Sequence, residues 1–215
     1  MTSEQVFFSF QGEGPLIGFP QIFVRFAGCN LQCDYCDESQ NLAELSTEEI
    51  YTKIEPLLKK KPHSISLTGG EPLLHVNQIK ELLPLLKLPI YLETNGTLPD
   101  HLAEIHHQVT YFSVDYKSGY DKEFIDFMAL LIEKESVWVK YIVKRDFQIT
   151  ELQHLAKLLA KLSPKIPLIL QPVTPTKLIK QPPRPEDLMR AYTVCLQHLP
   201  TIRIIGQMHK FIGIP

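Results

Sequence analysis

The 215-residue sequence is poor in cysteine, balanced in charge and without long uncharged runs. Its 4 cysteines are too few for a disulfide-held scaffold of this length. Lys and Arg total 22 against 24 Asp and Glu, so the formal charge of −2 offers no basic surface to nucleic acid or to an anionic membrane. Hydrophobic residues make up 44% and charged residues 21%, which excludes a disordered chain.

Targeting signals are also missing from the pattern. Uncharged stretches such as residues 14–24 are too short to cross a bilayer. The N-terminus shows neither the basic region nor the apolar region of a signal peptide. We therefore expect a cytoplasmic protein with one domain over residues 1–215, and no membrane or nucleic-acid partner.

Short β-branched or aromatic runs alternate along the chain with longer segments of helical period. Strands are expected over residues 21–27, 64–68, 89–94, 110–116, 137–143, 167–171 and 201–205. Strands separated by helices form βα units and a mainly parallel sheet. This order favours an α/β fold of the open, incomplete (β/α) barrel type, with a flat doubly wound sheet as the alternative. In either fold, ligands bind at the carboxyl ends of the strands.

Two segments carry the S/T-x-x-E/Q pattern of a helix N-terminal capping box. Ser46 precedes Glu49, and Thr150 precedes Gln153, each ahead of an apolar stripe. Pro56 lies inside the first of these helical patterns and should kink or shorten that helix, because proline lacks the backbone N–H.

Three cysteines lie close together directly after the first expected strand. Cys29, Cys33 and Cys36 are spaced C-x3-C-x2-C, in a loop of residues 28–38 that can turn three thiolates toward one centre. Soft sulfur ligands suit an iron–sulfur cluster or zinc. A structural zinc site needs a fourth Cys or His nearby, and the next histidines are His63 and His75. The spacing therefore favours an iron–sulfur cluster with one open iron over a group of reactive or buried cysteines.

Polar residues follow several later strands. They occupy residues 68–71, 93–96, 115–119 and 171–174. Each segment alone is also compatible with a solvated turn, but in a parallel sheet all of them lie at one rim, which favours a single site.

Two further features point to a small polar ligand. The run Gln-Gly-Glu-Gly at residues 11–14 precedes the first expected strand, and glycines flanking polar side chains suit a loop that presents them. Arg25 lies among apolar strand residues and needs an anionic partner. A substrate carboxylate and a structural Asp or Glu serve equally well.

Together these motifs resemble the radical S-adenosylmethionine (SAM) superfamily, in which a C-x3-C-x2-C loop follows the first strand and Gly-Gly-Glu-Pro follows the second. Residues 8–14, 25–31 and 209–210 are similar to those of one of its families, the 7-carboxy-7-deazaguanine synthases, from residue 8 to the C-terminus. The resemblance implies a homodimeric, modified and incomplete (β/α) barrel. It also implies a 4Fe–4S cluster, SAM, Mg²⁺ and a flavodoxin-like or ferredoxin-like reductant.

The activity implied by the resemblance is a step of queuosine biosynthesis for tRNA modification. In that family, 6-carboxy-5,6,7,8-tetrahydropterin is converted to 7-carboxy-7-deazaguanine with loss of ammonia. The reduced cluster cleaves SAM to a 5′-deoxyadenosyl radical, which takes a hydrogen from carbon 6 of the pterin. The radical rearranges with ring contraction and then regains hydrogen, so SAM acts catalytically.

The resemblance also assigns roles to residues. Cys29, Cys33 and Cys36 hold the cluster and are the catalytic residues in this sense. The substrate contacts are Gln11, Gly12, Glu13, Arg25, Thr68 and Pro215, the last in a C-terminal tail of residues 206–215 that closes on the site. The SAM contacts are Tyr35, Cys36, Asp37, Gly70, Asp115, Tyr116, Lys117, Gln171, Pro172, Val173 and Thr174.

The sequence departs from the family at one position. The family reads Cys-Asp-Thr where this chain has Cys36-Asp37-Glu38, and the family's threonine is a magnesium ligand. A carboxylate is a hard oxygen donor that suits Mg²⁺, so we predict that Glu38 binds the ion. It also adds negative charge beside a substrate carboxylate.

Three alternatives remain from the sequence. An activase of glycyl-radical enzymes shares the cysteine loop but does not account for residues 11–14 or 209–210. A non-catalytic, metal-stabilised binding module predicts zinc and no SAM cleavage. A degenerate family member without turnover is favoured by Glu38 alone.

Overall fold

The computed structural model describes residues 5–36 and 42–215, and in this part of the chain the strands form one sheet in the order β1 to β8. Strand β1 (Val6–Phe10) runs antiparallel to β2 (Pro20–Phe26), and each later neighbour pair is parallel. The other strands are β3 (Ser64–Gly69), β4 (Ile90–Thr94), β5 (Tyr111–Asp115), β6 (Val137–Val143), β7 (Leu168–Pro172) and β8 (Ile202–Ile204).

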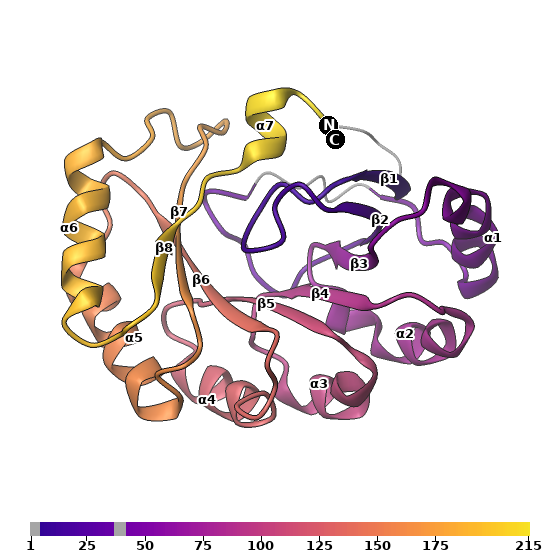
Figure 1. Ribbon diagram of the computed structural model, residues 1–215, viewed down its shortest axis with the longest axis horizontal. Coiled ribbons are helices and arrows are strands. Elements are labelled where there is room, and N and C mark those ends of the chain that lie inside the picture. The colour runs from indigo at the N-terminus through magenta and orange to yellow at the C-terminus, as the bar shows by residue number, and fades with distance from the viewer. Residues whose placement is uncertain (1–4, 37–41) are drawn as a thin grey trace.

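Helices cover the outer side of the curved sheet (Figure 1). They are α1 (Thr47–Leu57), α2 (Val76–Leu82), α3 (Pro99–Ile105), α4 (Asp121–Ala129), α5 (Ile149–Leu162) and α6 (Pro185–Leu196). The short α7 (Met208–Ile212) lies apart from this outer layer. Single 3₁₀ turns span Leu58–Lys60, Pro72–His75, Leu83–Leu85 and His106–Gln108. None of these helices is long and apolar enough to span a bilayer.

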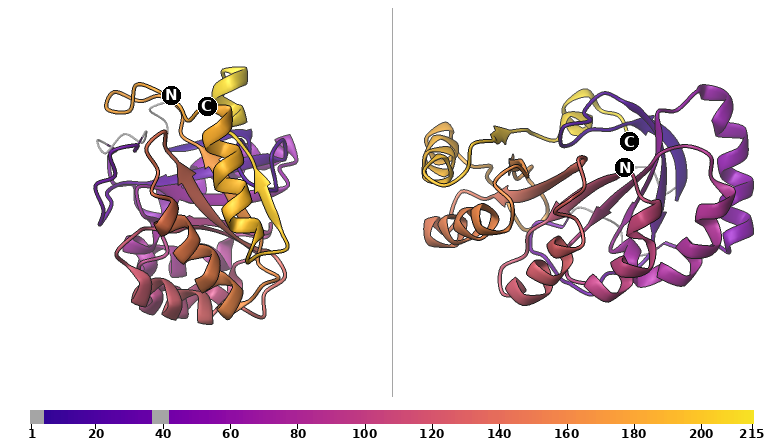
Figure 2. Two further views of the ribbon diagram at one scale, coloured as in Figure 1. Left: turned by 90° about the vertical axis from the view of Figure 1, so that its left-hand side faces the viewer. Right: turned by 60° about the horizontal axis from the view of Figure 1, so that its bottom comes forward.

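The open, incomplete (β/α) barrel that the sequence predicts is confirmed. The strands fan around a centre that faces away from the helices (Figure 2), and among the described strands the first and the last do not pair. Each strand of this sheet therefore has a helix-facing side and an inner side, and alternate residues share a side.

The two sides differ in composition. The helix-facing side joins the main apolar core, to which α5 contributes Leu152, Leu155 and Leu159. On the inner side, Tyr91, Trp138 and Ile169 form a small apolar cluster. Two residues further along the same strands, on the same side, lie Glu93, Lys140 and Gln171. The inner side thus changes from apolar to polar toward the carboxyl ends of the strands.

The structure corrects two expectations about local structure. The sequence predicts no strand before residue 21, but Val6–Phe10 form β1, which pairs along β2 from Val6 opposite Val24 to Phe10 opposite Pro20. The pairing gives hydrogen-bond partners to the backbone N–H and C=O groups of both strands. This effect depends on residues distant in the chain, so local strand propensity does not reveal it.

The second correction concerns Thr150. Helix α5 begins at Ile149, and its N-cap residue Gln148 makes no side-chain capping bond, so Thr150 lies within the first turn. The box at Ser46 is confirmed, since Ser46 Oγ accepts from Glu49 N at 3.2 Å and Ser46 N donates to Glu49 Oε2 at 2.7 Å. The effect expected of Pro56 is also confirmed, because α1 ends one residue after it.

Candidate active site

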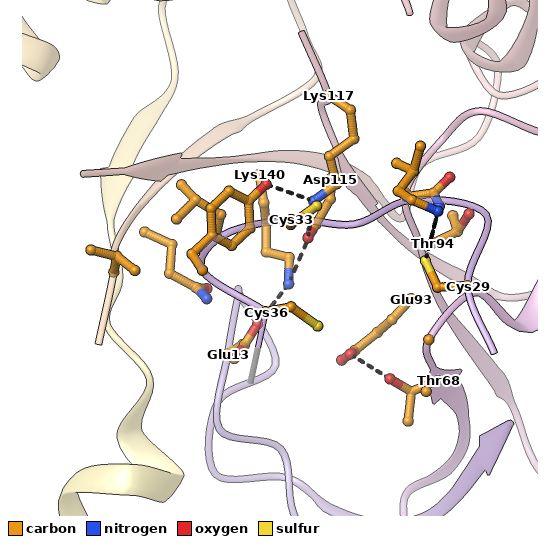
Figure 3. A pocket seen from close by; sticks show the side chains of 18 of the residues that line it. Glu13, Cys29, Cys33, Cys36, Thr68, Glu93, Thr94, Asp115, Lys117 and Lys140 are labelled. Carbon is orange, nitrogen blue, oxygen red and sulfur yellow. Dashed lines mark hydrogen bonds and ion pairs between the residues drawn. The ribbon is translucent and has the colours of Figure 1, made fainter. Parts of the chain in front are cut away.

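A cavity at the carboxyl ends of the strands is bordered by all three clustered cysteines. Cys29, Cys33 and Cys36 come from the loop after β2, and all three border the cavity (Figure 3). Cys29 and Cys33 are partly exposed and Cys36 is exposed. The backbone N–H of Leu31 donates to Cys29 Sγ at 3.4 Å. The loop therefore presents three thiols to one open space.

The turn after β3 packs against the start of this cysteine loop. Gly70 lies so close that a Cβ atom there would be 1.9 Å from the carbonyl oxygen of Gly28. Glu71 N donates to that same oxygen at 2.9 Å, and Gly70 N donates to the carbonyl of Phe26 at 3.2 Å. The Gly-Gly pair is therefore needed for close backbone approach, and any side chain at Gly70 would push the cysteine loop away.

The cavity wall also carries a buried network of alternating charge. Lys140 is 4% exposed, and its Nζ lies 2.6 Å from Glu13 Oε2 and 3.1 Å from Asp115 Oδ1. Lys117 Nζ lies 3.3 Å from Asp115 Oδ2 and donates to the hydroxyl of Tyr35 at 3.0 Å. The network joins the loop before β2 to the ends of β5 and β6 and to the cysteine loop.

The pKa values follow from this arrangement. Burial raises the pKa of Glu13, but the charge of Lys140 and hydrogen bonds from Lys140 and Gln207 lower it to about 2. Burial lowers the pKa of Lys140, but Asp115 and the two neighbouring glutamates raise it well above its usual range. Glu13 and Lys140 are therefore both ionised at neutral pH, and each stabilises the other.

Glu93 is a second carboxylate in the wall, with a different environment. Its Oε1 accepts from Gln11 Nε2 at 2.9 Å and its Oε2 accepts from Thr68 Oγ1 at 3.0 Å. Desolvation raises the pKa of Glu93, more than the attraction of Lys140 lowers it. Glu93, with a raised pKa, thus lies beside Glu13, with a lowered pKa. Two such carboxyl groups suit a site that recognises a ligand carrying several N–H donors.

A second cavity adjoins the first. Glu13, Thr68 and Glu93 border both, so the two cavities lie side by side. The remaining lining of the second cavity comes from β1, β2, the loop between them and the C-terminal segment: Phe7, Phe10, Gln11, Gly12, Phe23, Arg25, His209 and Pro215. The guanidinium of Arg25 lies 5.1 Å from the centre of the Phe7 ring, in a cation–π geometry.

The C-terminal segment covers this second cavity by contacts with the loop between β1 and β2. Met208 N donates to the carbonyl of Gly12 at 2.8 Å, and Gln207 Nε2 donates to Glu13 Oε1 at 2.7 Å. Ser9 Oγ donates to the carbonyl of Pro215 at 2.8 Å. Figure 1 shows α7 lying beside β1, across the open side of the barrel.

The structure brings most of the site residues expected from the sequence into these two cavities. The first is bordered by Glu13, Cys29, Cys33, Tyr35, Cys36, Thr68, Gly70, Asp115, Lys117, Gln171, Val173 and Thr174. The second is bordered by Gln11, Gly12, Glu13, Arg25, Thr68 and Pro215.

Two of the expected SAM contacts do not border these cavities. Tyr116 and Pro172 border neither cavity. The ring of Tyr116 packs edge-on against Phe124 on the helix side, with its hydroxyl donating to Asp121. Residues 37 and 38, the expected SAM contact Asp37 and the expected magnesium ligand Glu38, lie outside the described residues.

The structure adds wall residues that the sequence analysis did not assign. They include Lys140 and Gln207 in the first cavity and His209 in the second, whereas Glu93 and Asn95 belong to the polar segment 93–96 expected at the rim. Lys140 carries the same signal as Arg25, a lone cation among apolar strand residues. Gln207 carries no such signal, because its place depends on how the chain returns after β8.

The cavity suits a cluster with a bound cofactor. In the described part of the chain, no three His, Cys, Asp or Glu side chains converge on a point as ligands of a single ion do. A 4Fe–4S cluster takes one thiolate at each of three irons, so its ligands need to border a shared space, as the three cysteines do. Beside them, the buried Oε1 of Gln171 has no hydrogen-bond partner within the described structure and is free to accept from a ligand N–H.

Comparison with known proteins identifies a family model and relatives that cover most of the chain. The family model of the radical SAM superfamily matches residues 23–144. A 7-carboxy-7-deazaguanine synthase of Geobacter sulfurreducens is 34% identical over 98% of this chain and 96% of its own length. A 7-carboxy-7-deazaguanine synthase of Methanothermobacter thermautotrophicus is also 34% identical, over 98% of this chain and 96% of its own length.

A solved structure shares the fold. The crystal structure of SuiB from Streptococcus suis superimposes with a TM-score of 0.60 at 15% sequence identity, over 86% of this chain. This chain spans about half of that protein, since the match covers 48% of SuiB. At this identity the likeness concerns the fold alone.

Proposed function

The chain belongs to the radical SAM superfamily and, within it, to the 7-carboxy-7-deazaguanine synthases, and we propose that it converts 6-carboxy-5,6,7,8-tetrahydropterin to 7-carboxy-7-deazaguanine with loss of ammonia. The observation that carries this proposal is the meeting of the two cavities at Glu13, Thr68 and Glu93. One cavity is bordered by the cluster cysteines and the other by residues suited to an anionic, nitrogen-rich ring.

The first cavity holds the cofactors. Cys29, Cys33 and Cys36 bind a 4Fe–4S cluster, and SAM occupies the space between them and the charged wall. Bound together, the reduced cluster and SAM supply a hydrogen-abstracting radical. The SAM contacts proposed from lining side chains are Tyr35, Gly70, Asp115, Lys117, Gln171, Val173 and Thr174.

The second cavity holds the pterin. Arg25 lines this cavity and would pair with a substrate carboxylate, and Gln11 with Glu93 offers acceptors for the ring N–H groups. Thr68 lies between the two cavities and orients Glu93 through its hydroxyl. Gly12 and Pro215 bring the chain close around the substrate, which limits entry of water to a reactive radical.

The remaining parts of the proposal concern ions and partners. Glu38 binds a magnesium ion beside the substrate carboxylate. The enzyme acts as a cytoplasmic homodimer and takes electrons from a flavodoxin-like or ferredoxin-like protein. A Glu38→Thr variant tests the first point: magnesium dependence and magnesium affinity both change if the carboxylate binds the ion, and stay unchanged if it does not.

An anaerobic assay tests the activity. Reconstituted protein is incubated with reductant, SAM, Mg²⁺ and 6-carboxytetrahydropterin, and products are identified by mass spectrometry. We expect 7-carboxy-7-deazaguanine with little net consumption of SAM. Formation of 5′-deoxyadenosine without that product would contradict the substrate assignment and favour an activase. A protein that holds four irons and forms neither product would be a degenerate family member.

A further inference from the structure

The amide of Asn95 approaches the sulfur of one cluster cysteine. Asn95 directly follows β4, is 7% exposed and borders the first cavity. Its Nδ2 donates to Asn30 Oδ1 at 2.8 Å and lies 3.9 Å from Cys29 Sγ. A side-chain amide carries two hydrogens, so one nitrogen serves both acceptors.

The orientation of this amide is determined by its neighbours. Asn95 Oδ1 accepts from the backbone N–H of Thr97 at 3.1 Å and from its hydroxyl at 2.6 Å. A backbone N–H can only donate, so the amide oxygen must face Thr97 and the amide nitrogen must face Cys29.

The same side chains form a closed ring of hydrogen bonds at the start of the cysteine loop. Asn30 Nδ2 donates to Thr97 Oγ1 at 2.9 Å, which joins Asn30, Asn95 and Thr97 into one cycle. Glu71, which follows β3, also binds this cycle, because its Oε2 accepts from Asn95 N at 2.7 Å. The residue next to Cys29 is thus tied to the ends of two other strands.

We infer that Asn95 is a positioning residue that holds Cys29 and donates an N–H to its sulfur, and so raises the reduction potential of the cluster. The inference rests on the proposed function in that Cys29 binds the cluster. Reduction adds one negative charge, which spreads over the cysteine sulfurs, and an N–H donor stabilises that charge. Leu31 N, which donates to the same sulfur at 3.4 Å, adds to the effect.

The test measures the midpoint potential of the reconstituted cluster in the absence of SAM and pterin, by redox titration monitored by electron paramagnetic resonance. The variant is Asn95→Leu, which keeps a similar size and removes both donors. The control is Thr97→Val, which loosens the ring of hydrogen bonds but leaves the Asn95 amide and the backbone N–H of residue 97 in place. Iron content and the visible spectrum report whether each variant is loaded.

We expect the Asn95→Leu substitution to lower the equilibrium constant for cluster reduction about tenfold, which makes the midpoint potential more negative by ~59 mV for one electron. We expect less than a third of that shift in Thr97→Val. If Asn95→Leu does not load, Asn95→Ser replaces it, because serine is uncharged and too short to reach Cys29. Equal potentials in wild type and the Asn95 variant, or an equal shift in the control, would overturn the inference.

This result is separable from the proposed function. A wild-type protein that loads its cluster but makes no deazaguanine contradicts the substrate assignment and leaves the potential measurement valid. A protein that makes the product while the Asn95 variant keeps the wild-type potential contradicts the role of Asn95 alone.

Discussion

Single charged residues in the wall of the cavity contribute strongly to the stability of the protein. Lys140 pairs with Glu13 and Asp115, and its removal takes the ion-pair partner from Glu13 and leaves Asp115 with Lys117 alone. Breaking a buried ion pair by deleting one partner costs about 3–5 kcal/mol. We therefore expect Lys140→Met to lower the free energy of unfolding by about that amount, measured by chemical denaturation at neutral pH.

A matched control for Lys140 exists on the surface. Lys122 pairs with Asp126 at 3.0 Å, but its side chain is 85% exposed. Exposed pairs contribute at most about 1 kcal/mol, so Lys122→Met should change stability by less than that. Similar losses in the two variants would contradict the assigned importance of the buried network.

Glu71 gives the protein a pH dependence of its own. Burial raises the pKa of Glu71 to about 7, against hydrogen bonds from Asn95, Leu73 and Thr94 that lower it. Because the folded pKa lies above the unfolded value of 4.5, its contribution to stability is fully present below pH 4.5 and is lost as the pH rises through about 7. The loss amounts to about 2 kcal/mol between about pH 5 and about pH 8.

The Glu71→Gln variant isolates this contribution, because other titrating groups are common to both proteins. We expect the wild type to lose about 2 kcal/mol relative to the variant as the pH rises over that interval, measured by urea denaturation at several pH values. A constant difference between the two proteins would show that Glu71 does not change its protonation there.

At the scale of elements, the docking of the C-terminal segment depends on one glycine. A Cβ at Gly12 would lie 2.1 Å from His209 Nδ1, and Met208 N donates to the Gly12 carbonyl. We expect Gly12→Ala to displace α7, raise the KM for the pterin about tenfold and speed hydrogen exchange in residues 207–212. Gly206→Ala is the control, since nothing lies within 4 Å of its Cβ position. Unchanged exchange in Gly12→Ala would contradict this account.

The starts of α1 and α5 differ although their sequence patterns agree. Ser46 accepts the backbone N–H of Glu49, whereas Thr150 lies inside α5 and caps nothing. Loss of an N-cap hydroxyl costs about 1 kcal/mol, so Ser46→Ala should destabilise the protein by that amount. Thr150→Ala should cost less than half as much, and thermal unfolding of the two variants measures the contrast. Equal losses would indicate that Thr150 caps α5 after all.

At the scale of the molecule, the open barrel leaves its inner side to ligands. The apolar cluster of Tyr91, Trp138 and Ile169 lies on the inner side toward the amino ends of β4, β6 and β7, and the polar cavities lie toward the carboxyl ends. We expect SAM at 100 times its Kd to stabilise the reconstituted protein by about 2.7 kcal/mol, and the cluster-free protein by much less. Thermal shift under anaerobic conditions measures the difference. An equal shift in both forms would contradict SAM binding at the cluster.

Much of this protein follows from local sequence. The alternation of strands and helices predicts the unclosed, mainly parallel sheet, and strand periodicity places Thr68, Asp115 and Gln171 at its rim. The C-x3-C-x2-C spacing brings three thiols to one loop because all three are close in the chain. The capping box of α1 is equally local.

The tertiary structure decided the rest, because it depends on groups far apart in the chain. The pairing of β1 with β2, the contact of Gly12 with His209 and the approach of Asn95 to Cys29 each join separate segments. The sequence determines which residues can do chemistry and at which strand ends they lie. Only the folded chain decides which of them are buried together, and burial is what sets their charges and their reach toward a ligand.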